Sequence, residues 1–545
     1  MTALCWHSAV LAQTVPPNAQ PGRERELFTQ PRPPQAQPRG PAVTLPSTVA
    51  PAGADKVKVV IRRVEVAGST VYQQAELAKL YADLLAKPTT LATVYEIARR
   101  ITAKYGEDGY VLSRAIVPPQ EFEPKGAVVH IQVVEGWINK VRWPKQLSRY
   151  RDFFSEYAAK ITSERPANIK TIERYLLLAN DLPGLKFTTT LKPSDQPETS
   201  VLVVDVTEKP VDVLGRVDNR GTQARGPIQF LSTATINNVL GAHEALTLSY
   251  AGASPQTELQ YVSGYYRHVL TSEGLTTFAD ASYSWGQPGT QPLRILDYIT
   301  RSTVAEAGAS YPLLRSRERN FTVSALAFLS DSYSDILEAP FNVDRLRGAR
   351  GKLDGDFADT LQGINQINVT VSQGINGFGS TNNGNALASR ASGRVDFSKI
   401  EATVSRTQPL GQSLSAFASL YGQYAGTSLL APEQCGFGGR FFGRAYDPSE
   451  LLGDHCIEGI GELRYDPPVT NPQLTQLQLY GFGDYGRLFV REPAVGTDPQ
   501  SHGASVGAGL RTGFISHLAS DLQIAKAVAG PRDDWRFFFS VTASY

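Results

Sequence analysis

Residues 535–545, WRFFFSVTASY, decide the fold of this chain. Every second residue is apolar, and four of these six are aromatic: Trp535, Phe537, Phe539, Val541, Ala543 and Tyr545. The residues between them are mostly polar. A soluble sandwich buries its apolar face and rarely ends on an exposed aromatic, whereas a transmembrane barrel turns that face to lipid, with aromatics at the interfaces. The stretch therefore predicts a strand in the wall of a transmembrane β-barrel.

The same pattern extends back to about residue 211. Leu246, Leu248 and Tyr250 alternate with polar residues, and no segment of 211–545 has convincing helical periodicity. At roughly 20 residues per strand and connection, this region holds about 16 antiparallel strands. An even count leaves both ends of the barrel on one side, so we expect the preceding domains in the periplasm. The chain has no run of about 18 apolar residues, so no transmembrane helix is expected.

Residues 57–210 predict two copies of a small α+β module, at 57–143 and 144–210. The first has strand-like alternation at 57–66, two stretches of helical spacing, and strands at 110–117 and 127–134. The second repeats this order less completely, with strands at 186–191 and 200–206. Sheets of this kind leave edges to which an extended peptide can add a strand.

The composition of the N-terminal residues predicts a connecting segment that does not contribute to a hydrophobic core. Residues 9–12, AVLA, resemble the end of a secretory signal, so 1–12 is expected to be its remnant, with the true start upstream or truncated. Residues 13–56 carry ten of the 35 prolines and predict an extended linker. Within it, only 22–30 (GRERELFTQ) has the composition of a short helix.

Two of the three cysteines flank a glycine- and aromatic-rich segment. Cys435 and Cys456 are 21 positions apart. A disulfide across that segment is one interpretation, and two free thiols are the other, because spacing alone does not decide between them. His455 beside Cys456 lacks further ligands at metal spacing, so no metal site is expected.

Neither of two motif matches supports catalysis. Residues 503–507 (GASVG) match G-x-S-x-G around Ser505, with His502 nearby, but the nucleophile motif needs a strand–turn–helix elbow and this segment reads as a strand. Residues 481–486 (GFGDYG) match G-x-G-x-x-G, but no helix follows to bind a phosphate. We expect no enzyme activity and no cofactor, and the formal net charge of +1 gives no reason to expect nucleic acid as a partner.

Several segments, in order along the chain, resemble one family. Residues 109–115 (GYVLSRA), 129–136 (VHIQVVEG) and 174–184 (RYLLLANDLPG) look like POTRA domains. Residues 438–447 (GGRFFGRAYD) with 450–454 (ELLGD), and 482–486 (FGDYG), look like the sixth loop and the late-strand motif of two-partner secretion transporters. These TpsB proteins are the haemolysin and filamentous-haemagglutinin secretion and activation proteins of the BamA-like superfamily. The loop tip here, Gly443 to Tyr446, lacks the family's Val and Gly but keeps its Arg and aromatic residue.

The resemblance implies particular site residues. The loop of about 431–456 would fold into the lumen, with Arg444 against Asp484, and with Tyr446, Phe482 and Gly486 in the same lock. Alternation from Leu477 to Asp484 independently points Asp484 into the lumen, where a charge-assisted pair would fix the loop. The alternative is that Arg444 is a solvated loop charge and Asp484 one of many lumen polar groups. Phe539 and Tyr545 would form the end that the barrel assembly machinery recognises.

The implied function is protein secretion across the outer membrane of a Gram-negative bacterium. Two periplasmic POTRA domains would bind an unfolded exoprotein, a β-helical adhesin or haemolysin of the TpsA kind, and a 16-stranded pore in outer-membrane lipid would export it. The family also implies an N-terminal plug helix, for which 22–30 is short. One alternative is a BamA-like insertase, although two modules leave little space for its usual POTRA array. A barrel enzyme or a passive porin is another, and a porin does not explain the modules.

Overall fold

The computed structural model describes residues 15–29, 33–38, 49–123, 126–494, 496–515 and 517–545. The signal remnant predicted at 1–12 lies outside these residues. The chain divides into a unit of 1–38, 209–270 and 274–545 and a second unit of 39–208 with 271–273. Within the described residues, no helix combines the length and the apolar character needed to cross a membrane.

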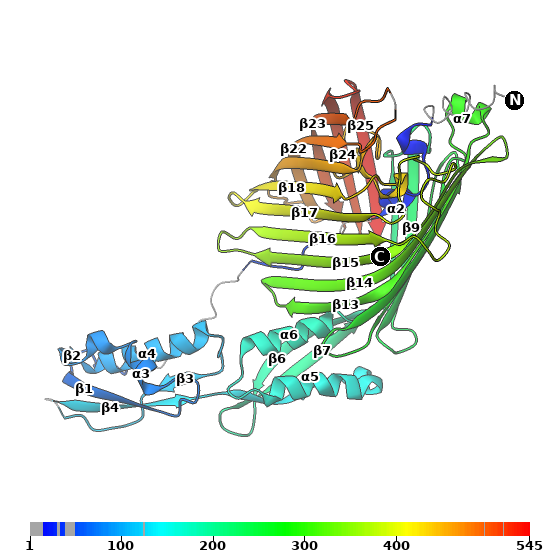
Figure 1. The fold of residues 1–545 in the computed structure, drawn as a ribbon. Coiled ribbons are helices and arrows are strands. Elements are labelled where there is room, and N and C mark those ends of the chain that lie inside the picture. Colours follow the sequence, from blue (N-terminus) through cyan, green and yellow to red (C-terminus); the bar gives the residue numbers. More distant parts are fainter. Residues whose placement is uncertain (1–14, 30–32, 39–48, 124–125, 495, 516) are drawn as a thin grey trace. The chain divides into compact units, whose positions relative to one another are not determined.

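The first unit is a closed antiparallel barrel of sixteen strands, as the alternation predicts (Figure 1). Each strand pairs with its sequence neighbours, except that β18 pairs with β21 across a long connection and β25 closes the wall against β8. The strands are β8 (Val211–Asp218), β9 (Ile228–Asn237), β10 (Glu244–Ser254), β11 (Gln260–Val269), β12 (Thr276–Gly286), β13 (Ile299–Arg315), β14 (Arg319–Ile336), β15 (Ala339–Ala358), β16 (Ile364–Gly374), β17 (Ser398–Pro409), β18 (Leu414–Ala425), β21 (His455–Tyr465), β22 (Leu474–Phe489), β23 (Gln500–Phe514), β24 (Leu518–Ala529) and β25 (Trp535–Ser544).

Short elements occupy the barrel connections and the segment before the modules. The β12–β13 connection holds α7 (Gln291–Ile295), and the β18–β21 connection holds η4 (Ala431–Glu433), β19 (Cys435–Phe437) and β20 (Leu451–Gly453). The N-terminal segment holds η1 (Pro17–Ala19) and α2 (Glu24–Phe28). The helix predicted at 22–30 is thus shorter than expected, and residue 30 lies outside the described part.

Strand β25 alternates as its sequence requires. Trp535 and Phe537 point outward, with 61% and 59% of their surfaces exposed, whereas Phe538 is buried on the inner face. There its ring lies under the guanidinium groups of Arg220 and Arg536, at 4.4 and 5.0 Å. The outward aromatic residues therefore lie on the face that the sequence assigns to lipid.

The barrel closes over a short seam. Five residue pairs join β25 to β8, from Ser540↔Asp218 to Ser544↔Leu214. Val213 and Tyr545 then exchange two backbone hydrogen bonds, at 3.0 and 2.9 Å. The last residue of the chain is therefore part of the closure.

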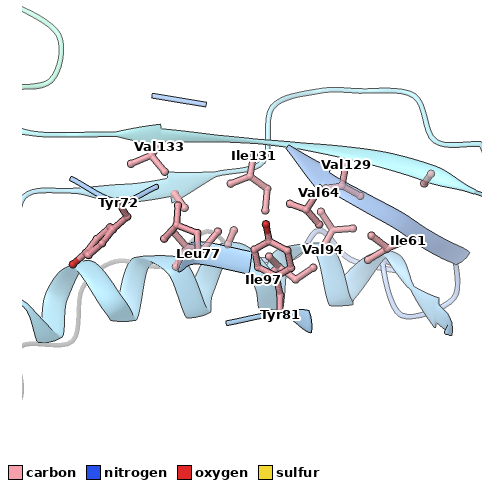
Figure 2. Packing of buried hydrophobic residues seen from close by; sticks show 14 of the residues in the cluster. Ile61, Val64, Tyr72, Leu77, Tyr81, Val94, Ile97, Val129, Ile131 and Val133 are labelled. Carbon is pink, nitrogen blue, oxygen red and sulfur yellow. The ribbon is translucent and has the colours of Figure 1, made fainter. Parts of the chain in front are cut away.

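The first module of the second unit packs two helices on a four-stranded sheet of order β2-β1-β4-β3. Its elements are β1 (Lys58–Ala67), α3 (Gln74–Ala78), η2 (Ala82–Leu84), β2 (Pro88–Thr90), α4 (Leu91–Glu107), β3 (Arg114–Ile116) and β4 (Ala127–Val134). Figure 2 shows Val64, Val129 and Ile131 of the sheet facing Leu77 and Ile97 of the helices. The strand predicted at 110–117 is shorter, and β2 is an addition to the predicted order.

The second module packs two helices on a three-stranded sheet of order β5-β7-β6. Its elements are β5 (Trp137–Arg142), η3 (Lys145–Tyr150), α5 (Arg151–Ser163), α6 (Ile169–Asn180), β6 (Leu185–Pro193) and β7 (Thr199–Glu208). The predicted boundary at 143/144 is wrong, because β5 pairs in parallel with β7 and belongs to the second sheet. The second module therefore begins near Trp137.

Candidate functional site in the barrel lumen

The connection of residues 426–454 between β18 and β21, called the inner loop below, folds into the barrel. Its strands β19 and β20 pair from Cys435↔Gly453 to Phe437↔Leu451. Cys435 forms a disulfide with Cys456 at the start of β21, which confirms the disulfide alternative. The inner loop is thus a covalently anchored hairpin, and its buried side chains pack against inward-facing residues of β21 and β22.

The tip of the inner loop contacts two different carboxylates. The backbone N–H of Arg444 donates to Oδ2 of Asp484 at 3.1 Å. The guanidinium group extends past Asp484, lies over the ring of Phe482 at 4.7 Å, and pairs with Glu462 at 2.7 Å. The expected pair between the Arg444 side chain and Asp484 is therefore wrong about the partner. The two carboxylate oxygens of Asp484 accept hydrogen bonds from the Arg444 backbone N–H and the Ser505 hydroxyl, and the Arg444 side chain reaches Glu462 on the neighbouring strand instead.

Glu462 is a charge centre that the motif comparison did not identify. Its side chain is fully buried and forms ion pairs with Arg444, Arg464 and Arg511 at 2.7, 2.6 and 2.7 Å. A buried carboxylate is tolerated when such charge-assisted bonds compensate for its lost hydration. The signal was present in β21, where Glu458 and Glu462 share the inward face between outward apolar or glycine positions.

Asp484 also organises the wall behind the loop. The Ser505 hydroxyl donates to Oδ1 of Asp484 at 2.5 Å and accepts the Ala445 N–H at 3.3 Å. Ser505 is buried on the inner face of β23, whereas His502 lies three positions away on the exposed outer face. An odd spacing in a strand places the two side chains on opposite faces. The G-x-S-x-G match therefore has no serine–histidine pair.

Two glycines on the inner wall and a third just beyond β24 form a socket for loop aromatics. A Cβ on Gly486 would lie 2.3 Å from the Phe437 ring, and a Cβ on Gly503 would lie 2.7 Å from the same ring and 3.0 Å from Tyr446. Beyond β24, Gly530 would meet the Tyr446 hydroxyl at 2.9 Å. The Tyr446 hydroxyl donates to the carbonyl of Ala529. Phe437 and Tyr446 are therefore seated where only glycine leaves space.

Residues 15–29 and 33–38, called the N-terminal segment below, also lie in the lumen. Near one end of the barrel, Glu24 pairs with Arg225 of the β8–β9 connection at 2.8 Å. Toward the other end, the N–H of Gln37 donates to the carbonyl of Arg317 in the β13–β14 turn at 2.7 Å. Between them, Arg25 pairs with Asp280 on the inner face of β12 at 3.1 Å. The segment therefore passes along the lumen.

The N-terminal segment and the inner loop contact each other. Arg23 donates through Nη1 to the carbonyl of Gln434, and Asn18 donates to Asp447 at 3.4 Å. Gly22 lies so near Pro432 that a Cβ would come within 2.8 Å of it. The structure thus brings Arg444, Tyr446, Asp484, Phe482 and Gly486 together, with the N-terminal segment beside them.

The two predicted C-terminal recognition residues lie apart from this site. Phe539 is half-buried on the outer face of β25, and Tyr545 has 80% of its surface exposed. Neither side chain takes part in the lumen contacts described above. Their predicted role in assembly stays a prediction.

Comparison with known proteins agrees with this architecture. The family described as "Haemolysin secretion/activation protein ShlB/FhaC/HecB" matches residues 198–512, and the family "POTRA domain, ShlB-type" matches 59–136. The outer membrane transporter CdiB of Dickeya dadantii (strain 3937) is 23% identical over 476 residues, covering 84% of this chain and 81% of the relative. The heme/hemopexin transporter protein HuxB of Haemophilus influenzae is 21% identical over 463 residues, covering 83% and 80%.

Solved structures with a similar fold are known. CdiB from Escherichia coli superposes with a TM-score of 0.72 at 18% identity, covering 100% of this chain and 98% of that chain. The first family match spans more than half of the chain and includes the inner loop, Glu462, Asp484 and Ser505. The chain therefore belongs to the haemolysin secretion/activation (ShlB/FhaC/HecB) family and is a TpsB-type outer-membrane transporter of two-partner secretion, with its POTRA domains in the periplasm.

Proposed function

We propose that this transporter secretes one partner exoprotein, which its POTRA domains capture unfolded in the periplasm and its barrel passes to the cell surface. The observation that carries the proposal is a lumen filled by two displaceable parts, the N-terminal segment and the inner loop. The N-terminal segment is held by ion pairs, hydrogen bonds and the buried Phe28, and the tip of the inner loop by the same kinds of contact, while its base stays anchored through the Cys435–Cys456 disulfide. A β-helical adhesin or haemolysin is the class of partner proposed.

An open sheet edge in the second POTRA domain supports capture of an extended chain. The Phe187 N–H points away from β7 and donates to the side-chain oxygen of Asn180 at 2.7 Å. Antiparallel pairing alternates, so the backbone groups of Thr189 and Leu191 point the same way. Among the described strands, none pairs with this edge of β6. An unfolded exoprotein can add a strand there through backbone hydrogen bonds, which are tolerant of sequence.

The lock on the inner loop has an energy suited to gating. Hydrogen bonds to charged groups contribute about 1.5–3 kcal/mol each, and a partly hydrated lumen lowers the value. Such contacts hold the loop in the resting barrel but can be exchanged for contacts with a passing chain. Folding of the exoprotein outside the cell, together with edge pairing, would drive the transport.

Comparison of surface and culture-supernatant proteins tests this function in the source bacterium. Loss of the transporter should remove one large exoprotein and leave other outer-membrane proteins at normal levels. A chain lacking residues 57–210 should insert as a heat-modifiable barrel but restore no export. Unchanged export by that chain would reject the POTRA role, whereas a general loss of outer-membrane proteins would indicate an insertase.

A further inference from the structure

The lumen wall beneath α2 has a paired acidic group and an adjoining apolar surface. Asp280 on β12 and Glu306 on β13 are direct cross-strand partners, and both face the lumen. Two carboxylates in this position repel each other unless a cation lies between them. Beside them, five buried inward-facing or loop residues form an apolar surface: Leu231, Ala251, Ala253, Leu259 and Tyr261. This acidic and apolar area is called the wall patch below.

The N-terminal segment covers the wall patch with one cation and one aromatic ring. Arg25 lies 3.1 Å from Asp280 and 3.2 Å from Glu306, so one guanidinium bridges both carboxylates. Phe28, one helical turn later, is 6% exposed, and its ring centroid lies 5.1 Å from that of Tyr261. Among the ion pairs of the described residues, Asp280 takes part only in the one with Arg25. The wall patch is therefore built for an Arg and a Phe at a fixed separation.

Under the proposed function, a passing chain needs the space in the lumen, so the N-terminal segment leaves this position during export. Its departure uncovers the apolar surface and leaves Asp280 and Glu306 side by side, with Arg350 still bound to Glu306 at 2.6 Å. An uncovered apolar surface and an unpaired carboxylate are both unfavourable, so a polypeptide in the lumen that supplies the same groups gains binding free energy there. The carboxylates and the apolar surface of the wall patch thus determine which side chains bind there after the N-terminal segment has left.

We propose, on the basis of the proposed function, that the wall patch is a transit site for the exoprotein. It takes a segment with a basic residue and a bulky aromatic residue about three positions apart in a helical turn, as Arg25 and Phe28 are, or about two apart in an extended strand. Both spacings correspond to roughly 5–7 Å along the chain. The N-terminal segment occupies the site as an internal mimic of the cargo, and arriving cargo competes with it directly.

Channel recordings in planar bilayers test the site with a defined probe. The full chain carrying Arg25→Glu and Phe28→Ala has a weakened occupant but an intact wall patch. A synthetic peptide of residues 21–29 (PGRERELFT), added from the periplasmic side, should halve the current at a concentration at least about tenfold lower than the same peptide with both substitutions. Equal block by the two peptides overturns the inference.

Matched wall variants locate the block. Asp280→Asn should remove most of the advantage of the native peptide. Asp354→Asn makes the same change on the inner face of β15, where the partner is Asn368 at 2.7 Å, and should leave the advantage intact. Equal effects of the two variants count against the wall patch. If the doubly substituted chain does not fold, the wild-type channel gives the same comparison, since the native peptide should shorten its spontaneous open intervals.

Failure of this inference is distinguishable from failure of the proposed function. If the wild-type chain exports the exoprotein but the two peptides block equally, the transit site is rejected and secretion stands. If no exoprotein depends on the transporter, secretion is rejected, and with it the assignment of the wall patch to cargo.

Discussion

Substitution of Gly486 by alanine should unseat the inner loop without unfolding the barrel. The new Cβ would lie 2.3, 2.7 and 2.9 Å from three carbons of the Phe437 ring. Ordinary carbon contacts are about 3.5–4.0 Å, so the ring would have to retreat by about 1 Å. It has little freedom to do so, because it is fully buried and also abuts Gly503 and Gly443.

Overpacking of this kind costs about 1–3 kcal/mol. Since the strain exists only with the loop in place, the cost falls on the equilibrium between seated and withdrawn loop. The withdrawn population should rise by about 5- to 150-fold.

Hydrogen exchange measured by mass spectrometry reads this equilibrium at the loop amides. The Tyr446 N–H, which donates to the Gly443 carbonyl at 2.8 Å, should exchange faster by that factor. Gly483→Ala is the control on the same strand, because a Cβ there faces outward and meets its nearest atoms at 3.9 Å. Heat-modifiable migration of both variants would show that the barrels are folded. Equal exchange in the two variants would refute the socket reasoning.

Three further perturbations have defined outcomes. Glu462→Gln should cost about 1.5–3 kcal/mol of loop seating, because the buried guanidinium group of Arg444 loses its carboxylate partner, and faster exchange at the loop tip would show it. Cys435→Ser opens a disulfide that spans 21 positions and should loosen the loop base by about 3 kcal/mol, seen as faster exchange in β19. In the first POTRA domain, burial alone would raise the pKa of Glu135. Hydrogen bonds from Thr70, Val71 and Tyr105 outweigh this effect, so the pKa lies below its usual value. Because the pKa is lowered, this stabilisation is present above about pH 4.5 and is lost as the pH falls through the pKa of the folded state. Hydrogen exchange in β4, corrected for its intrinsic pH dependence, should therefore become faster in acid for the wild type. The increase should be smaller for Glu135→Gln.

The barrel could be predicted from sequence because its signal is local. Alternation in 535–545 and in 477–484 fixes which side chains face inward, and the structure agrees for Phe538 and for Asp484. The identification of the POTRA-like segments, the inner loop and the late-strand motif depended instead on resemblance to a known family.

What the sequence could not supply depends on distant contacts. Residues 137–142 follow β4 directly and read as the end of the first module, yet they pair with β7, about sixty residues away. The partner of Arg444 was missed for a similar reason, because alternation places Glu462 and Asp484 on the same inner face but does not say which one a long side chain reaches. The passage of the N-terminal segment through the lumen depends on Arg225, Asp280 and Arg317, from three separate parts of the barrel.

The seam between β25 and β8 sets the order in which this molecule can form. Phe539 donates its N–H to Asn219, 320 positions earlier in the chain, and contacts of such separation form late and slowly. The wall cannot close before β25 is available to pair with β8, and until then two strand edges remain open to aggregation. The first and last strands of this barrel therefore depend on each other for protection against intermolecular pairing.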